Sequence, residues 1–311
     1  MFKTRPLFLA GLLVCGLGCA SSTPPERQAP PYARTAQHYR AFADADALAA
    51  YLRADSEAGK LISAHRGGAG PAYPENALAT FEHTLRYTPA LIESDVRMSR
   101  DSVLVLMHDE TLERTTTGEG AVAAWSFAAL RTLLLEDERG IITPFRIPSL
   151  AEALAWAEGR AVLTLDIKPD VPPESVVQAI RRAGAEDRVV VITYTLNELL
   201  SYHRLAPDVL LSASVATEND VQRLFESPID PSRLIAFVGV SEVDADVLGL
   251  LRAHNIRSTL GTFGTVDERA RKAGPEVYQA LLDRGVGVLA TDVPAVAARA
   301  LASYTTPMAT P

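Results

Sequence analysis

The chain has 311 residues, and 48% of them are hydrophobic, which is enough to bury a large core within one domain. Acidic residues outnumber lysine and arginine by 38 to 30, which gives a formal charge of −8 at pH 7. Nucleic acid is therefore excluded as the expected partner, because its phosphates require a basic protein surface. A small phosphorylated ligand stays compatible, since a local cluster of cations or a metal ion can balance its charge.

The amino terminus has the pattern of an export signal. Two basic residues precede an apolar run at 7–19 that is too short to span a membrane, and the run ends in GLGC before a polar, proline-rich stretch. We therefore expect a signal peptide at residues 1–18, lipidation of Cys19 as a membrane anchor, and a flexible linker at 19–34. The expected location is the membrane surface facing the periplasm or the cell exterior. In the alternative, a plain signal peptide is cleaved and Cys19 carries no lipid.

The two cysteines of the chain, Cys15 and Cys19, both fall in this amino-terminal segment. The domain that follows them has no thiol. Cysteine catalysis, disulfide bonds and metal sites with cysteine ligands are therefore excluded for that domain.

Apolar runs rich in β-branched residues alternate with helical patterns from residue 61 almost to the end of the chain. A helical pattern at residues 35–60 precedes them, and we expect it to pack across one end of the domain. Apolar strands separated by helices predict a parallel sheet that is covered on both faces. The runs lie at residues 61–65, 91–96, 103–109, 161–168, 189–194, 209–215, 234–240, 256–261 and 286–292.

These nine runs fit an α/β fold of the TIM-type (β/α)8 barrel class with one accessory strand, and a doubly wound open sheet is the alternative. Polar residues follow runs spread over the whole chain, whereas an open sheet concentrates them near one switch point, so we favour the barrel. The predicted barrel is a single domain at residues 61–303. It has an insertion at 110–148, after the third strand, and a C-terminal tail at 304–311.

Acidic residues with a spacing of two occur in the second run. Glu93 and Asp95 lie on the same face of a strand, where two buried carboxylates would repel each other. A divalent cation removes this repulsion, and oxygen ligands favour Mg²⁺ or Ca²⁺. Asp166 and Lys168 repeat the spacing, so Asp166 can complete the metal site while Lys168 faces an anionic ligand. The alternatives are a solvated strand edge, salt bridges to Arg97, and a structural Asp166–Lys168 pair.

Histidines end two of the runs. His65 and His108 would meet at the carboxyl rim of the barrel, where one can remove a proton and the other can supply one. A single histidine at the end of a strand is more often a structural, hydrogen-bonded residue. We favour the catalytic interpretation because four runs end in complementary groups.

Two stretches resemble the glycerophosphodiester phosphodiesterase family. They are HRGGAGPAYPENALATF at 65–81 and IESDVRMSRDSVLVLMHDETLERTTTGEG at 92–120, and IPSLAEAL, LTLDIKP and GVGVLATDVP add matches up to about residue 295. The resemblance implies a TIM-type barrel that hydrolyses glycerophosphodiesters to glycerol 3-phosphate and an alcohol with a divalent metal. Whether the substrate's own hydroxyl or water attacks phosphorus first stays open. The resemblance also implies an acid–base pair of His65 and His108, phosphate contacts from Arg66 and Lys168, and metal ligands Glu93, Asp95 and Asp166.

The chain departs from the family pattern in three places. Asp166 stands where the family usually has glutamate. Ala77 follows the P-E-N motif in place of threonine, and we expect Asn76 to cap the next helix. The stretch STLGTFGTVDE at 258–268 lacks the usual tryptophan, so we expect an altered alcohol or glycerol subsite.

Two other functions stay open from the sequence. The first is a lysophospholipase D or phospholipase-C-like activity, for which an apolar lip around the site would select a lysolipid over a small diester. The second is a non-catalytic lipoprotein that keeps the barrel only to bind a ligand.

Overall fold

A computed structural model of the chain describes residues 34–240 and 242–304. The predicted signal peptide, the lipidation site Cys19 and the tail after Tyr304 lie outside the described residues. Within those residues, no helix is both long enough and apolar enough to cross a membrane.

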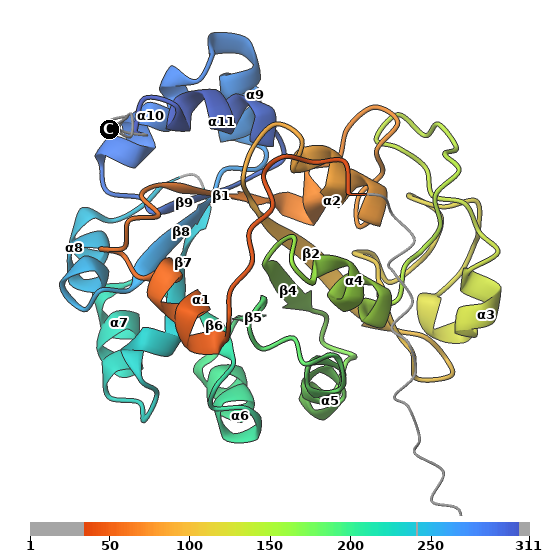
Figure 1. The fold of residues 1–311 in the computed structure, drawn as a ribbon, viewed down its shortest axis with the longest axis horizontal. Helices are drawn as coiled ribbons and strands as arrows, with labels where there is room; N and C mark the ends of the chain where they lie inside the picture. The colour runs from red at the N-terminus through yellow and green to blue at the C-terminus, as the bar shows by residue number, and fades with distance from the viewer. Residues whose placement is uncertain (1–33, 241, 305–311) are drawn as a thin grey trace, which may run out of the picture. The chain divides into compact units, whose positions relative to one another are not determined.

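Eight parallel strands close into a barrel (Figure 1). In chain order they are β1 (Leu61–Ala64), β2 (Leu91–Met98), β4 (Leu163–Ile167), β5 (Val189–Thr193), β6 (Leu210–Ser214), β7 (Leu234–Val240), β8 (Arg257–Gly261) and β9 (Val288–Thr291). Each strand pairs with the next, β9 pairs with β1, and β1 also pairs with β2 through Ser63 opposite Leu91. This closure confirms the predicted (β/α)8 barrel and excludes the open sheet.

The remaining run forms the accessory strand β3 (Leu104–Leu106). It pairs antiparallel with the far end of β2, where Val96 lies opposite Leu106. Among the strands of the described residues, β3 pairs with β2 alone, and its Val105 also makes one isolated bridge to Ser149. It therefore extends the sheet beside the barrel and takes no part in the barrel wall.

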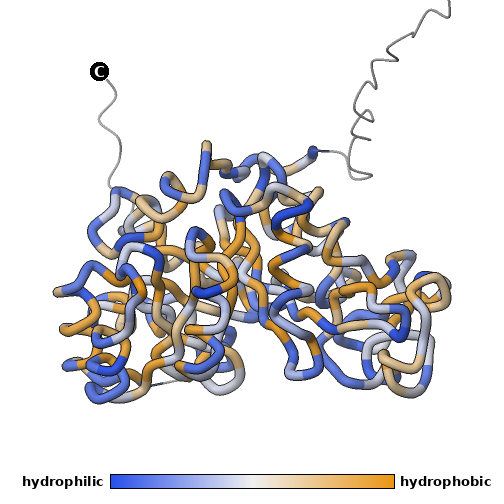
Figure 2. The backbone as a smooth tube through the Cα atoms, turned by 90° about the horizontal axis from the view of Figure 1, so that it is seen from below, coloured by the Kyte–Doolittle hydropathy of each residue, from blue (hydrophilic) through white to orange (hydrophobic). Residues whose placement is uncertain are grey.

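Helices cover the outside of the barrel, and Figure 2 shows hydrophobic chain inside and hydrophilic chain at the outer turns. Val176 and Ile180 of one helix, for example, are fully buried in the same core as Val191. Several helices begin at a capping box that is readable in the sequence, such as Thr195 with Glu198. The helices are α2 (Leu78–Thr84), α4 (Leu150–Ala157), α5 (Pro173–Ala183), α6 (Leu196–Leu205), α7 (Glu218–Phe225), α8 (Ala245–Ala253), α9 (Thr265–Ala273), α10 (Glu276–Asp283) and α11 (Pro294–Leu301).

The amino-terminal end of the barrel is closed by α1 (Ala45–Leu52). The helix is shorter than the pattern at 35–60 predicts, because Asp44 caps its start by accepting a hydrogen bond from the amide of Ala47. Leu48 and Leu52 are buried against the first residues of the barrel strands, including Leu61 and Leu91. The helix thus plugs the end of the barrel opposite the carboxyl rim.

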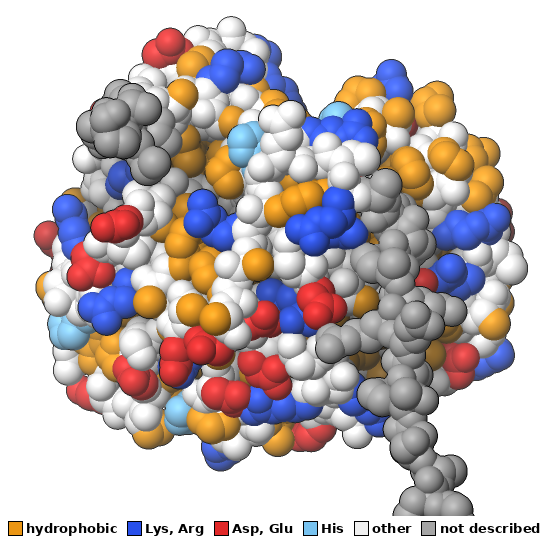
Figure 3. Space-filling view, viewed as in Figure 1, with side chains coloured by type: hydrophobic (Ala, Val, Ile, Leu, Met, Phe, Trp, Pro, Cys, Tyr) orange, Lys and Arg blue, Asp and Glu red, His pale blue; other side chains and the backbone are white. Residues whose placement is uncertain are grey.

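The predicted insertion at 110–148 lies beside the barrel, around α3 (Phe127–Leu130) (Figure 1). Short bridges such as Glu136 with Ile142 organise it, and it packs around a small core that it shares with β3. Asp137 accepts a hydrogen bond from the amide of Ala72, which attaches the insertion to the loop after β1. On the face shown in Figure 3, acidic and basic side chains are interspersed.

Candidate functional site

The chain turns sharply at the carboxyl end of β1. The strand ends at Ala64, and Arg66 adopts a left-handed conformation with φ of 50°. Gly67 follows with φ of 87°, and a Cβ there would lie 2.3 Å from the ring of Phe81, so only glycine fits. Because the strand has ended, His65 and Arg66 can both face the rim.

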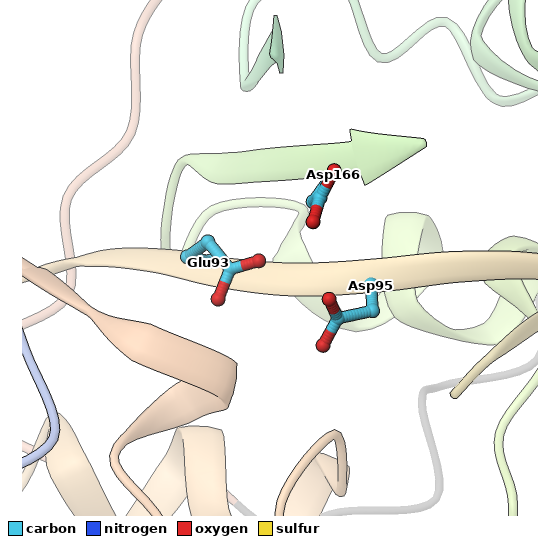
Figure 4. A group of neighbouring side chains, drawn as sticks. All are labelled: Glu93, Asp95 and Asp166. Carbon is cyan, nitrogen blue, oxygen red and sulfur yellow. The ribbon is translucent and has the colours of Figure 1, made fainter. Parts of the chain in front are cut away.

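Three carboxylates meet at this rim from two neighbouring strands (Figure 4). Glu93 and Asp95 share one face of β2, and strand register places Asp95 beside Asp166 of β4. One oxygen of each of the three lies within 4.8 Å of the others, and all three residues are buried. The structure therefore brings together the three predicted metal ligands.

Neighbouring groups hold two of these carboxylates in place. The Nζ of Lys168 lies 2.7 Å from an oxygen of both Asp95 and Asp166. Asn76 donates from Nδ2 to Asp95 at 2.7 Å and accepts from the Asp95 amide at 2.9 Å. The helix cap expected of Asn76 is wrong, because α2 begins after Ala77 and has no side-chain cap. With φ of 57°, Asn76 is turned toward Asp95 instead.

The three buried carboxylates of the cluster oppose one another's ionisation. Burial, followed by the charge of Asp95, raises the pKa of Glu93 to about 8. Burial opposes ionisation of Asp95 as well, but the charge of Lys168 and the Asn76 hydrogen bond keep its pKa low. The Oδ1 of Asp166 is buried and accepts no hydrogen bond from the described residues. Three close oxygen donors, a buried oxygen without a partner and a carboxyl whose ionisation its neighbours oppose together fit Mg²⁺ or Ca²⁺.

His65 lies beside this cluster and is held on two sides. Its Nδ1 is 2.7 Å from Oδ1 of Asp292, and its ring stacks on Phe263 with centroids 4.5 Å apart. It lines a cavity of about 90 Å³ together with Glu93 and Asp166. Burial alone would lower its pKa, but the Asp292 hydrogen bond and the charges of Glu93 and Asp292 raise it. Within the stretch at 258–268, which lacks tryptophan, Phe263 thus supplies an aromatic ring that contacts His65 directly.

His108 reaches the rim by a route that the sequence did not indicate. It does not end a barrel strand; antiparallel β3 returns the chain to β2, where the Met107 amide donates to the carbonyl of Asp95. The Nδ1 of His108 is 2.7 Å from Asp109, which Arg114 also contacts. Because the amide of Met107 is hydrogen-bonded to Asp95, the next residue, His108, lies on that side of the cluster.

The predicted phosphate ligands lie among these carboxylates. Arg66 donates from its amide to Glu93 at 2.6 Å, and from its guanidinium to Glu75 at 3.0 Å. Arg114 donates to the same Glu75. Arg97 instead donates to the carbonyl of His108 and to Asp170. The alternative in which Arg97 pairs with Glu93 or Asp95 is therefore wrong.

Several site residues were missed by reasoning from the sequence. All of them lie inside quoted stretches, so motif proximity was the available signal. The contacts of Asp292 and Phe263 with His65 join segments that are far apart in the chain, whereas Asp109 contacts its neighbour His108. The missed residues are Glu75, Asp109, Phe263 and Asp292, together with the role of Asn76.

Comparison with known proteins gives one consistent result. A model of the glycerophosphoryl diester phosphodiesterase family matches residues 65–294. A glycerophosphodiester phosphodiesterase of Bacillus altitudinis is 33% identical over 163 residues, which cover 49% of this chain and 64% of that protein. The chain spans only 63% to 64% of the length of this and two similar curated relatives.

Solved structures have the same fold. A glycerophosphoryl diester phosphodiesterase from Parabacteroides distasonis is 34% identical, with a TM-score of 0.81 over 87% of this chain and 95% of that one. A phosphodiesterase from Oleispira antarctica, solved in complex with the product sn-glycerol-3-phosphate, is 20% identical, with a TM-score of 0.61 over 80% of this chain and 98% of that one. At that identity the second likeness concerns the fold alone.

Proposed function

The chain belongs to the glycerophosphoryl diester phosphodiesterase family, and on that premise we propose that it hydrolyses glycerophosphodiesters to glycerol 3-phosphate and an alcohol. The observation that carries the proposal is the cluster of Glu93, Asp95 and Asp166 within 4.8 Å at the barrel rim. Two histidines, each paired with a carboxylate, flank this cluster. A diester phosphate would meet metal ligands, cations and proton-transfer groups in one place.

The three carboxylates would hold one divalent cation, Mg²⁺ or Ca²⁺. When bound, such an ion polarises the phosphoryl oxygens and offsets the charge that develops on them. The shorter side chain of Asp166, relative to the usual glutamate, is compatible with the site because strand register already places Asp166 beside Asp95.

Proton transfer is assigned to the two histidines. Asp292 occupies Nδ1 of His65, which leaves Nε2 to exchange a proton with the substrate. Asp109 occupies Nδ1 of His108 in the same way. Arg66 and Lys168 now pair with carboxylates at the rim, Glu75 and Asp95. Because these pairs lie where the phosphate would enter, both cations could turn from their carboxylates toward it.

The test is hydrolysis of glycerophosphocholine and glycerophosphoethanolamine, followed through release of glycerol 3-phosphate. We expect activity with Mg²⁺ or Ca²⁺, loss of activity with EDTA, and loss of activity in His65→Ala and His108→Ala. His203→Ala is the matched control, because His203 lies on α6 outside the site. Activity that survives both EDTA and His108→Ala would refute the mechanism. Ligand binding without any turnover would instead support the non-catalytic alternative.

Lysophospholipids are a second candidate substrate class. Ile141 and Ile142 of the insertion are 55% and 56% exposed, and Asp137 links their turn to the loop after β1. These side chains can contact an acyl chain. Replacing both isoleucines with serine should lower kcat/KM for lysophosphatidylcholine and leave glycerophosphocholine turnover unchanged. Equal effects on the two substrates would rule out this lipid contact.

We also propose that the protein is exported and anchored through a lipid on Cys19. Support comes from the apolar run at 7–19 and the GLGC ending in the sequence. Cys19→Ser should abolish labelling by a fatty acid and release the protein from the membrane fraction. Cys15→Ser is the matched control, and equal labelling of both variants would contradict the assignment.

A further inference from the structure

A buried polar network lies behind His65, on the side away from the cavity. Its centre is Asp267 of α9, which is fully buried. Asp267 accepts hydrogen bonds from the hydroxyl of Tyr278 at 2.6 Å, the hydroxyl of Thr291 at 3.0 Å and the amide of Asp292 at 2.7 Å. None of these groups has a role in the mechanism described above, except Asp292 through its side chain.

The network reaches His65 by a first route through Asp292. The Asp267 carboxylate fixes the backbone of Asp292 at the end of β9, and the Asp292 side chain holds Nδ1 of His65. Although burial opposes it, the contact with His65 lowers the pKa of Asp292, so this carboxylate is ionised and accepts from Nδ1–H. Any shift of the Asp292 backbone would therefore move or turn the imidazole.

A second route runs through the loop that carries Phe263. The amide of Asp267 donates to the carbonyl of Thr262 at 2.9 Å, and Thr262 in turn donates to the carbonyl of Ala290 in β9. Phe263 follows directly and stacks on His65. The side chain of Asp267 thus fixes Asp292, and its backbone amide fixes the loop that carries Phe263. Asp292 and Phe263 are the two residues that hold the His65 ring.

A structural purpose alone is a weak explanation of this arrangement. Burying a carboxylate is costly unless every donor is well placed, and replacing buried ionic groups by apolar ones is often neutral or stabilising. Burial and the hydrogen bond to Asp267 raise the pKa of Tyr278, so Tyr278 stays a hydroxyl donor. The consequence specific to this network is the orientation of His65.

We propose that Asp267, supported by Tyr278, is a positioning residue for His65. It holds Asp292 and Phe263 so that Nδ1–H points to Asp292 and Nε2 points to the cavity. The inference rests on the proposed function, in which His65 exchanges a proton with the substrate through Nε2. Asp267 itself touches neither the substrate nor the metal ligands.

Kinetics of three variants test the proposal. Asp267→Asn should lower kcat by roughly 10- to 100-fold, by analogy with the loss of a hydrogen-bond partner that orients a metal-binding histidine. KM should stay within about twofold, because no substrate contact is lost. Tyr278→Phe should lower kcat to a smaller extent. Tyr202→Phe is the matched control, because Tyr202 is buried in α6 and its hydroxyl has no hydrogen-bond partner among the described residues. The kcat of this variant should equal that of the wild type.

Combining variants separates positioning from general destabilisation. Asp267→Asn in the Asp292→Asn background should cost clearly less than it does in the wild type, because Asp267 acts in part through Asp292. Full multiplication of the two single effects would overturn the proposal. A wild-type kcat in both Asp267→Asn and Tyr278→Phe would overturn it as well.

A spectroscopic readout keeps the test independent of the proposed function. Long-range ¹H–¹⁵N spectra of the wild type should show neutral His65 as the Nδ1–H tautomer, and Asp267→Asn or Tyr278→Phe should shift it toward a mixture. Unchanged spectra in both variants would refute the positioning role. Failure of the wild type to hydrolyse any diester would refute the proposed function alone.

Discussion

Asp95 is held by Lys168 and by Asn76, and Asn76 contacts both its side chain and its backbone amide. Asn76 makes two hydrogen bonds to Asp95, and its left-handed backbone is tolerated by asparagine and glycine. We predict that Asn76→Gly keeps the turn but weakens binding of the divalent cation by roughly 10- to 100-fold, as expected when the outer partner of a metal ligand is lost. Isothermal titration with Mg²⁺ and Ca²⁺ measures this change.

Asn255→Gly is the matched control for that variant. Asn255 also has a positive φ, of 60°, and also holds a backbone amide with its side chain, that of Asp55. It precedes β8, at the end of the barrel opposite the site. Its metal affinity should equal that of the wild type; equal losses in the two variants would mean that the effect of Asn76→Gly is not local.

Phe263 acts on one face of His65, and its removal gives a second prediction at this scale. Aromatic pairs contribute about 0.5–1.5 kcal/mol beyond burial, so we expect Phe263→Ala to lower kcat/KM roughly 2- to 10-fold. Phe225→Ala is a close control, because Phe225 stacks on His254 away from the site, with ring centroids 3.7 Å apart. Steady-state kinetics on one diester compares them, and an unaffected Phe263→Ala would exclude a role for the stack.

Among the structural elements, β3 explains how His108 comes to lie near the same carboxylates as His65. His65 follows a barrel strand, whereas His108 follows the antiparallel strand β3. The nine runs correctly indicated one accessory strand. The expectation that His108 ends a strand of the barrel rim, as His65 does, was wrong, because β3 is antiparallel and lies outside the barrel wall. Periodicity identifies strands but not their direction, which depends on tertiary pairing.

The plug helix α1 gives a prediction about stability. Leu48 is fully buried against the amino ends of the strands, so Leu48→Ala should lower the free energy of unfolding by about 2–5 kcal/mol. Leu205→Ala, at a side chain that is 38% exposed, should change it by less than about 0.5 kcal/mol. Urea unfolding measures both. Similar losses in the two variants would show that α1 does not close the barrel in solution.

The raised pKa of Glu93 makes the free energy of unfolding of the protein depend on pH and on binding of a divalent cation. Between the ordinary value of 4.5 and about 8, the folded chain keeps a proton that the unfolded chain releases. The metal-free protein should therefore become less stable as pH rises through this window. A divalent cation requires the ionised form, so its stabilising effect should grow over the same window.

Thermal unfolding at several pH values, with EDTA and with Mg²⁺ or Ca²⁺, tests this linkage. Glu93→Gln should flatten the downward slope of the metal-free protein and remove most of the stabilisation by metal. If the metal-free slopes of wild type and Glu93→Gln coincide, Glu93 is not the group that retains the proton.

Local sequence patterns were enough to predict the class of the fold and the types of residue at its rim. Alternating runs predicted the barrel, and the two-residue spacing of Glu93 and Asp95 placed both on one face, because side-chain direction along a strand has a fixed period. Which groups meet at the rim depends on how the strands pair and close. The register of β2 with β4 sets Asp95 beside Asp166, and barrel closure brings Asp292 to His65 across 227 positions of the chain. Local periodicity fixes the face of a residue, but strand register and closure fix its partners, and these depend on contacts between distant segments.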